Sequence, residues 1–140
     1  MNGYSLFELT VALALLAVAS SVLTPALAGY RDRMTVLAAR ETVVGLLHET
    51  RAAARRVGAA SLQVDAERAR VRVAIGDSVI RAVDLGGQGV RIDLPRGRVR
   101  GEIAYNGLGI GVFANETVEF SAGSERARLV VSSYGRVRRD

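Results

Sequence analysis

Residues 3–28 of the chain, GYSLFELTVALALLAVASSVLTPALA, decide its fold. The run from Leu9 to Ala28 is 20 residues long and carries no charge, and one acidic residue, Glu8, stands at its edge. A helix of about 20 apolar residues matches the ~30 Å hydrocarbon core of a bilayer. An unpaired carboxylate in hydrocarbon costs about 3 kcal/mol or more and usually marks a functional pairing. The stretch therefore predicts a membrane-spanning helix with a functional acid at one end.

Two other interpretations of this run are a buried helix and a cleaved secretory signal. A small domain seldom buries a helix that is apolar on all sides, so the buried helix is the weakest of the three. Residues 25–28, PALA, precede Gly29 in the small-x-small form of a leader-peptidase site. Cleavage after Ala28 would release a secreted β-domain. Against that reading, no Lys or Arg precedes the run, and helix-forming residues continue beyond it.

The segment around Gly3, Tyr4 and Glu8 resembles the processing motif of type IV pilins and type II secretion pseudopilins. In that family a prepilin peptidase cuts after the Gly and methylates the new terminal amine. The resemblance implies cleavage between Gly3 and Tyr4, N-methylation of Tyr4, and pairing of Glu8 with the terminal amine of a neighbouring subunit. Burying a carboxylate or an amine alone has a large desolvation cost, which their mutual attraction offsets when the two are buried as a pair. The leader, Met-Asn-Gly, lacks the family's usual Lys or Arg, so the orientation in the membrane rests on the resemblance.

The helix is expected to continue past the membrane as an amphipathic rod that ends at Gly58. Apolar residues recur at helical spacing along its expected buried face: Tyr30, Met34, Leu37, Val44, Leu47 and Ala54. The polar face is expected to carry Arg33, Arg40, Glu41, Glu49 and Arg51. The resemblance and the apolar pattern together imply four segments: a short leader (1–3), a transmembrane and filament-core helix (4–28), its amphipathic continuation (29–58) and a C-terminal β-rich domain (59–140).

After Gly58 the apolar period changes from helical to two, which predicts short strands separated by Gly- and Pro-containing turns. The predicted strands are 61–65, 69–75, 79–85, 90–94, 98–105, 112–114, 117–121 and 127–133. In residues 68–75 the arginines alternate with apolar residues, as in a strand with one buried face. The expected fold class is α+β: one long N-terminal helix packed on antiparallel β-sheet, a pilin-like arrangement.

Composition argues against catalysis. The 140 residues include no Cys and one His, too few parts for a Cys–His nucleophile or a His/Cys metal cluster. We therefore expect no enzyme activity, no catalytic residues, and no cofactor or metal site. The formal net charge is +5, and every basic residue is Arg.

The C-terminus, SSYGRVRRD (132–140), resembles the closing strand and tail of the H-type pseudopilins, the GspH/FimT family. In the FimT branch a terminal Gly-Arg-x-Arg stretch is associated with DNA binding. The matching positions are Gly135, Arg136 and Arg138, with Arg139 added. Clustered guanidinium groups contact phosphates of any sequence. Asp140 and the terminal carboxylate offset two of these three charges.

The function implied by these resemblances is that of a minor pseudopilin or minor pilin. Its partners would be other pilin or pseudopilin subunits, the prepilin peptidase and the bacterial inner membrane. It would span that membrane once, with its C-terminal domain in the periplasm. One alternative is a DNA-binding minor pilin of the FimT type; another is the secreted β-domain cleaved after Ala28.

Overall fold

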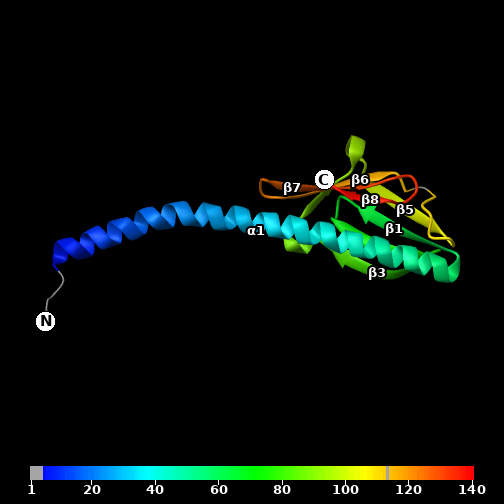
Figure 1. Ribbon diagram of the computed structural model, residues 1–140, viewed down its shortest axis with the longest axis horizontal. Helices are drawn as coiled ribbons and strands as arrows, with labels where there is room; N and C mark the ends of the chain where they lie inside the picture. The colour runs from blue at the N-terminus through cyan, green and yellow to red at the C-terminus, as the bar shows by residue number, and fades with distance from the viewer. Residues whose placement is uncertain (1–4, 113) are drawn as a thin grey trace.

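The computed structural model describes residues 5–112 and 114–140. One α-helix, α1, runs from Leu6 to Val57, a length of 52 residues. At 1.5 Å per residue the helix is about 78 Å long. Figure 1 shows its first half projecting alone and its second half lying along the β-sheets. The predicted α+β, pilin-like architecture is confirmed.

Local sequence explains where α1 begins and ends. Ser5 is the N-cap, and its Oγ accepts a hydrogen bond of 3.2 Å from the N–H of Glu8. At the other end Gly58 adopts φ +97°, and its N–H donates to the Ala54 carbonyl. Glycine enters this backbone region at little cost. The helix stop predicted at Gly58 is confirmed. Pro25 lies inside the helix, which Figure 1 shows as curved but unbroken.

The rest of the chain forms two antiparallel four-stranded sheets, with strand orders β3-β2-β1-β5 and β4-β6-β7-β8. The strands are β1 (Ala59–Asp65), β2 (Arg70–Ile75), β3 (Ser78–Asp84), β4 (Arg91–Asp93), β5 (Arg100–Asn106), β6 (Glu116–Ala122), β7 (Glu125–Val131) and β8 (Val137–Arg139). Two 3-10 turns, Gly86–Gln88 and Pro95–Gly97, flank β4. Seven of the eight predicted strands therefore exist, with shifted ends.

The predicted strand at 112–114 is wrong for its described residues, 112 and 114. The N–H of Gly111 donates to the Tyr134 carbonyl (3.2 Å), whereas the N–H of Val112 donates to the Ala104 carbonyl (2.9 Å). Successive backbone groups thus bond to different segments, and no ladder forms. Conversely, β8 at the C-terminus was not predicted as a separate strand, and it pairs with β7.

One hydrophobic core joins α1 to both sheets. In β2, Val71 and Val73 are buried, and Arg70 and Arg72, which alternate with them, are half-buried on the other face, as predicted. The predicted helix face is wrong at its start, because Tyr30 is 64% exposed and Met34 is also exposed. Val36 is the first fully buried residue of α1, and the large apolar side chains before it remain exposed among the described residues.

Candidate functional sites: an exposed apolar helix and an arginine-lined cavity

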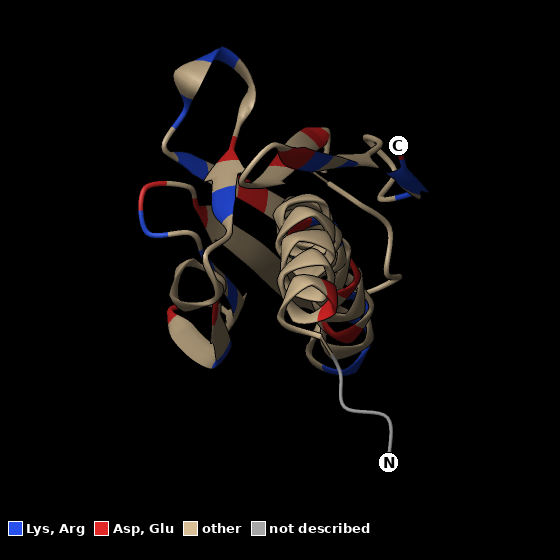
Figure 2. Cartoon of the chain, turned by 90° about the vertical axis from the view of Figure 1, so that its left-hand side faces the viewer, with Lys and Arg blue, Asp and Glu red and all other residues tan. Residues whose placement is uncertain are grey.

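The first half of α1 is apolar and uncovered. Its large side chains from Leu6 to Leu27 are exposed all around the helix. Within the described part of the chain, α1 is the one helix long and apolar enough to cross a membrane. Figure 2 looks at the molecule from the side to which the helix projects and shows mostly uncharged residues on it. About 23 residues of helix, some 35 Å, suffice to cross the hydrocarbon core.

Glu8 occupies the third helical position of this segment, one turn after the cap residue Ser5. Ser, Thr or Asp at the cap with Glu three residues later is the pattern of a capping box. An acid in the first turn also interacts favourably with the positive end of the helix dipole. Glu8 therefore has a local role that the sequence interpretation missed, although the Ser5-Leu6-Phe7-Glu8 spacing carries the signal. The proposed processing residues, Gly3 and Tyr4, lie outside the described residues.

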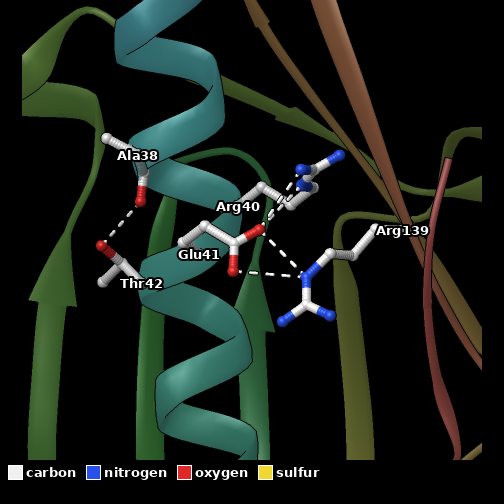
Figure 3. A network of polar contacts seen from close by, with 5 residues as sticks. All are labelled: Ala38, Arg40, Glu41, Thr42 and Arg139. Atoms are coloured by element: carbon white, nitrogen blue, oxygen red, sulfur yellow. Dashed lines mark hydrogen bonds and ion pairs between the residues drawn. The ribbon is translucent and has the colours of Figure 1, made fainter.

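The C-terminal arginines do not form one cluster of free cations. Arg139 reaches α1, where its Nε donates to Glu41 Oε1 at 3.0 Å. Glu41 also accepts from its neighbour Arg40, so two guanidinium groups share one carboxylate (Figure 3). The hydrogen bond from Arg139 is the largest influence on Glu41 and lowers the pKa of its carboxyl below the ordinary value of 4.5. This contact ties β8 to the helix.

The other two arginines of the tail differ from each other. Arg138 pairs with Asp140 at 2.9 Å on the surface. Arg136 is exposed and makes no ion pair with any described residue, while its backbone N–H donates to Ser132 Oγ. Of the three arginines predicted for DNA binding, Arg136 alone has a guanidinium free of a carboxylate among the described residues. In Figure 2 the blue C-terminal segment lies at the rim of the molecule.

Gly135, the first residue of the Gly-Arg-x-Arg stretch, has a packing role. It adopts φ +80°, and a Cβ placed on it would lie 2.5 Å from Cε1 of Tyr105. Real Cβ atoms do not approach a ring so closely, so this position accepts only glycine without rearrangement. The turn is closed by a 2.8 Å hydrogen bond from the N–H of Gly135 to the Ser132 carbonyl.

A cavity of about 390 Å³ lies between α1 and the C-terminal segment. Its lining residues are Val44, Leu47, His48, Arg51, Tyr105, Tyr134, Gly135, Arg136, Val137 and Arg139. His48, the one histidine of the chain, is an exposed residue of this lining. Burial raises the pKa of the Tyr105 hydroxyl, and the charge of Arg51 partly opposes that shift. The cavity therefore combines cationic groups with apolar and aromatic walls.

The prediction that Arg51 lies on the polar, solvent-exposed face of the helix is wrong. Arg51 is half-buried, and its Nε is buried without a hydrogen-bond partner among the described residues. The loop at Gly109 covers it: a Cβ built on Gly109 would lie 3.2 Å from Arg51 Cγ. Arg51 follows Leu47 by four residues and Val44 by seven, which places all three on one helix face. That spacing was the available signal.

A larger cavity, about 480 Å³, lies on the outer face of the first sheet. It is lined by Arg68, Arg72 and Arg100, but also by Asp65 and Glu102. Arg68 lies 3.9 Å from Asp65 in an exposed ion pair. Both signs of charge occur along its wall. It therefore has weaker selectivity for a charged ligand than the cavity between α1 and the C-terminal segment, which we call the arginine-lined cavity.

Comparisons of the chain with protein-family models, with curated proteins and with solved structures find no match. The described residues form a single long helix, apolar and uncovered in its first half and packed through its second half on antiparallel sheet.

Proposed function

We propose that the protein is a minor pseudopilin or minor pilin, a structural subunit of an envelope-spanning filament. One observation carries the proposal: a continuous 52-residue helix is uncovered and apolar in its first half and packed on a β-domain in its second. Such a helix is stable in a bilayer and equally stable against the same helix of other subunits. The subunit would be stored in the bacterial inner membrane with its domain in the periplasm, then transferred to the filament.

Helix continuity also supports an uncleaved helix over a secreted domain. Residues 28 and 29, the proposed leader-peptidase site, lie inside α1 with no break on either side. Cleavage there would remove the apolar half of the helix and leave the packed half with a new, charged end. Processing after Gly3 would instead preserve the whole of α1.

Glu8 would act in assembly through its charge. Cleavage before Tyr4 would create an ammonium group on Tyr4, one helical turn before Glu8 in the sequence. In a stack of helices, the Glu8 carboxylate of one subunit would neutralise the terminal amine of its neighbour. Each group is expensive to bury alone, and removing one partner of a buried pair costs about 3–5 kcal/mol. The pairing would therefore select the correct register of subunits.

Glu8→Gln tests this proposal because Gln retains the capping box and removes only the charge. In cells that make the filament, we expect the Gln variant to be recovered in sheared filaments at least about tenfold less than the parent. Ser5→Ala is the matched control, since it removes the cap oxygen that accepts from Glu8 and retains the carboxylate. Equal incorporation of Glu8→Gln and the parent would contradict assembly through Glu8.

A DNA-binding minor pilin is the second candidate, favoured by the exposed guanidinium of Arg136. Because Arg138 and Arg139 are each paired with a carboxylate, Arg136 is the one tail arginine among the described residues that remains unpaired for a phosphate. Binding of duplex DNA to the full chain in neutral detergent, measured across salt, tests it, because each neutralised phosphate makes the slope of log K against log salt more negative by about 0.9. If Arg136→Ala and Arg138→Ala leave any affinity unchanged, this candidate fails.

A further inference from the structure

The arginine-lined cavity has a shape and chemistry that the filament role does not use. On one side the helix presents Val44, Leu47 and Arg51, and on the other Val137 and the Tyr105 ring close the walls. The guanidinium of Arg51 thus sits beside apolar side chains. A group suited to this cavity has an apolar stem and a polar, hydrogen-bond-accepting end.

Of the three arginines that line the cavity, Arg139 is paired with Glu41 of α1, whereas Arg51 and Arg136 make no ion pair with a described residue. None of the described residues lining it is acidic, although the cavity on the first sheet includes two carboxylates. The Nε of Arg51 is buried and lacks an acceptor among the described residues. Arg136 lines the same cavity and makes no ion pair with a described residue. Because a buried donor without an acceptor is destabilising, an incoming oxyanion gains hydrogen bonds that the folded chain leaves open.

The surface beside the cavity is apolar. Tyr134 at its mouth is 77% exposed, and Ile110 and Val112 are exposed as well. The Gly111 N–H to Tyr134 carbonyl hydrogen bond holds their two segments together. Contiguous exposed apolar residues typically mark a protein-binding surface. Surfaces that bind nucleic acid are more polar and more uniformly basic, so the surroundings favour a protein partner.

The helix residues that line the cavity, from Val44 to Arg51, belong to the packed half of α1, near its end at Val57. The loop that packs on Arg51 reaches the end of α1, since a Cβ built on Gly107 would lie 3.1 Å from the Gly58 carbonyl oxygen. In the filament proposed above, the domains of neighbouring subunits would lie next to one another, which would bring a second subunit within reach of the cavity.

We propose that the cavity between α1 and the C-terminal strand binds an acidic side chain, carried on an apolar segment of a neighbouring filament subunit. Its carboxylate would accept hydrogen bonds from Arg51 and Arg136, and its apolar flanks would cover Tyr134 and Ile110. The identity of the partner as a filament subunit rests on the proposed function. The carboxylate site itself rests on the cavity.

The test uses the purified full chain in neutral detergent and a capped pentapeptide with one glutamate between leucine and 4-fluorophenylalanine. Binding is followed by fluorine NMR, with the glutamine version of the peptide as the uncharged probe. We expect the glutamate peptide to bind at least about tenfold more tightly, since hydrogen bonds between charged groups are the strong ones. Arg136→Ala should remove most of that preference.

Arg138→Ala is the matched control, because it also removes one arginine, two residues after Arg136. The side chain of Arg138 pairs with Asp140 and does not line the cavity. It should leave peptide binding unchanged. Equal binding of the two peptides, or no binding of either, would overturn the proposal. The proposal would also be overturned if duplex DNA displaced the glutamate peptide and if that displacement were weakened equally by Arg136→Ala and Arg138→Ala. These outcomes are independent of Glu8→Gln, which tests filament assembly.

Discussion

Gly135 illustrates how one residue can be required for packing within a stretch that resembles a binding motif. We expect Gly135→Ala to destabilise the domain by about 1–3 kcal/mol, because the new Cβ meets the Tyr105 ring and the backbone has φ +80°. Urea unfolding followed by tyrosine fluorescence measures the change, since the chain has no Trp. Gly87→Ala is the control: a Cβ there meets nothing within 4 Å. Equal stability of the two variants would contradict the packing role.

Glu41 gives the domain a contribution to stability that depends on pH. Because Arg139 lowers its pKa in the folded chain, this contribution is present above the ordinary value of 4.5 and is lost as pH falls through the lower folded value. Thermal unfolding of Glu41→Gln and the parent, compared from pH 7 down to pH 3, should show a difference that shrinks below pH 4.5. A difference that is constant across this range would show that the carboxylate of Glu41 does not stabilise the fold.

At the residue scale, sequence reasoning found some positions and missed others for physical reasons. The cap at Ser5 was available in the spacing to Glu8. The spacing of Arg51 from Leu47 and Val44 indicated its helix face, but it did not indicate the covering loop at Gly109, which is distant in sequence. The ion pair of Arg139 with Glu41 likewise joins the chain's last strand to its first helix. No local periodicity encodes such contacts.

At the scale of elements, the two halves of α1 should respond differently to the same substitution. Leu47 is 1% exposed in the core, whereas Leu16 is 62% exposed in the apolar half. We expect Leu47→Ala to lower the free energy of unfolding of the domain by about 2–5 kcal/mol and Leu16→Ala to change it by less than about 0.5 kcal/mol. Urea unfolding of the full chain in detergent measures both. A comparable loss for Leu16→Ala would mean that the first half packs on the domain.

Strands were predictable where alternation along the strand was set by one buried face. In β2 the alternating valines and arginines fix which side packs on the helix. The segment 112–114 fails because its neighbours bond to two different segments, which a period of two does not reveal. Strand β8 is short and half-exposed, so its pattern is weak, and its pairing with β7 depends on the turn at Gly135.

At the scale of the whole molecule, the uncovered half of α1 is the feature that the domain cannot stabilise by itself. A water-exposed run of about 20 apolar residues has no partner in the described chain, so it requires lipid or other helices. We expect the full chain to remain with membranes after alkaline carbonate washing and to need detergent for extraction. Recovery in the soluble fraction would contradict a membrane-spanning role for α1.

The mass of the mature N-terminus, determined by mass spectrometry on protein isolated from the membranes of cells that make it, tests the central claim most directly. Assembly through α1 predicts a chain that begins at Tyr4 with one methyl group on its amine, so that the apolar helix and Glu8 are both retained. A chain that begins at Gly29 would contradict the claim, because it would lack the segment on which filament assembly depends.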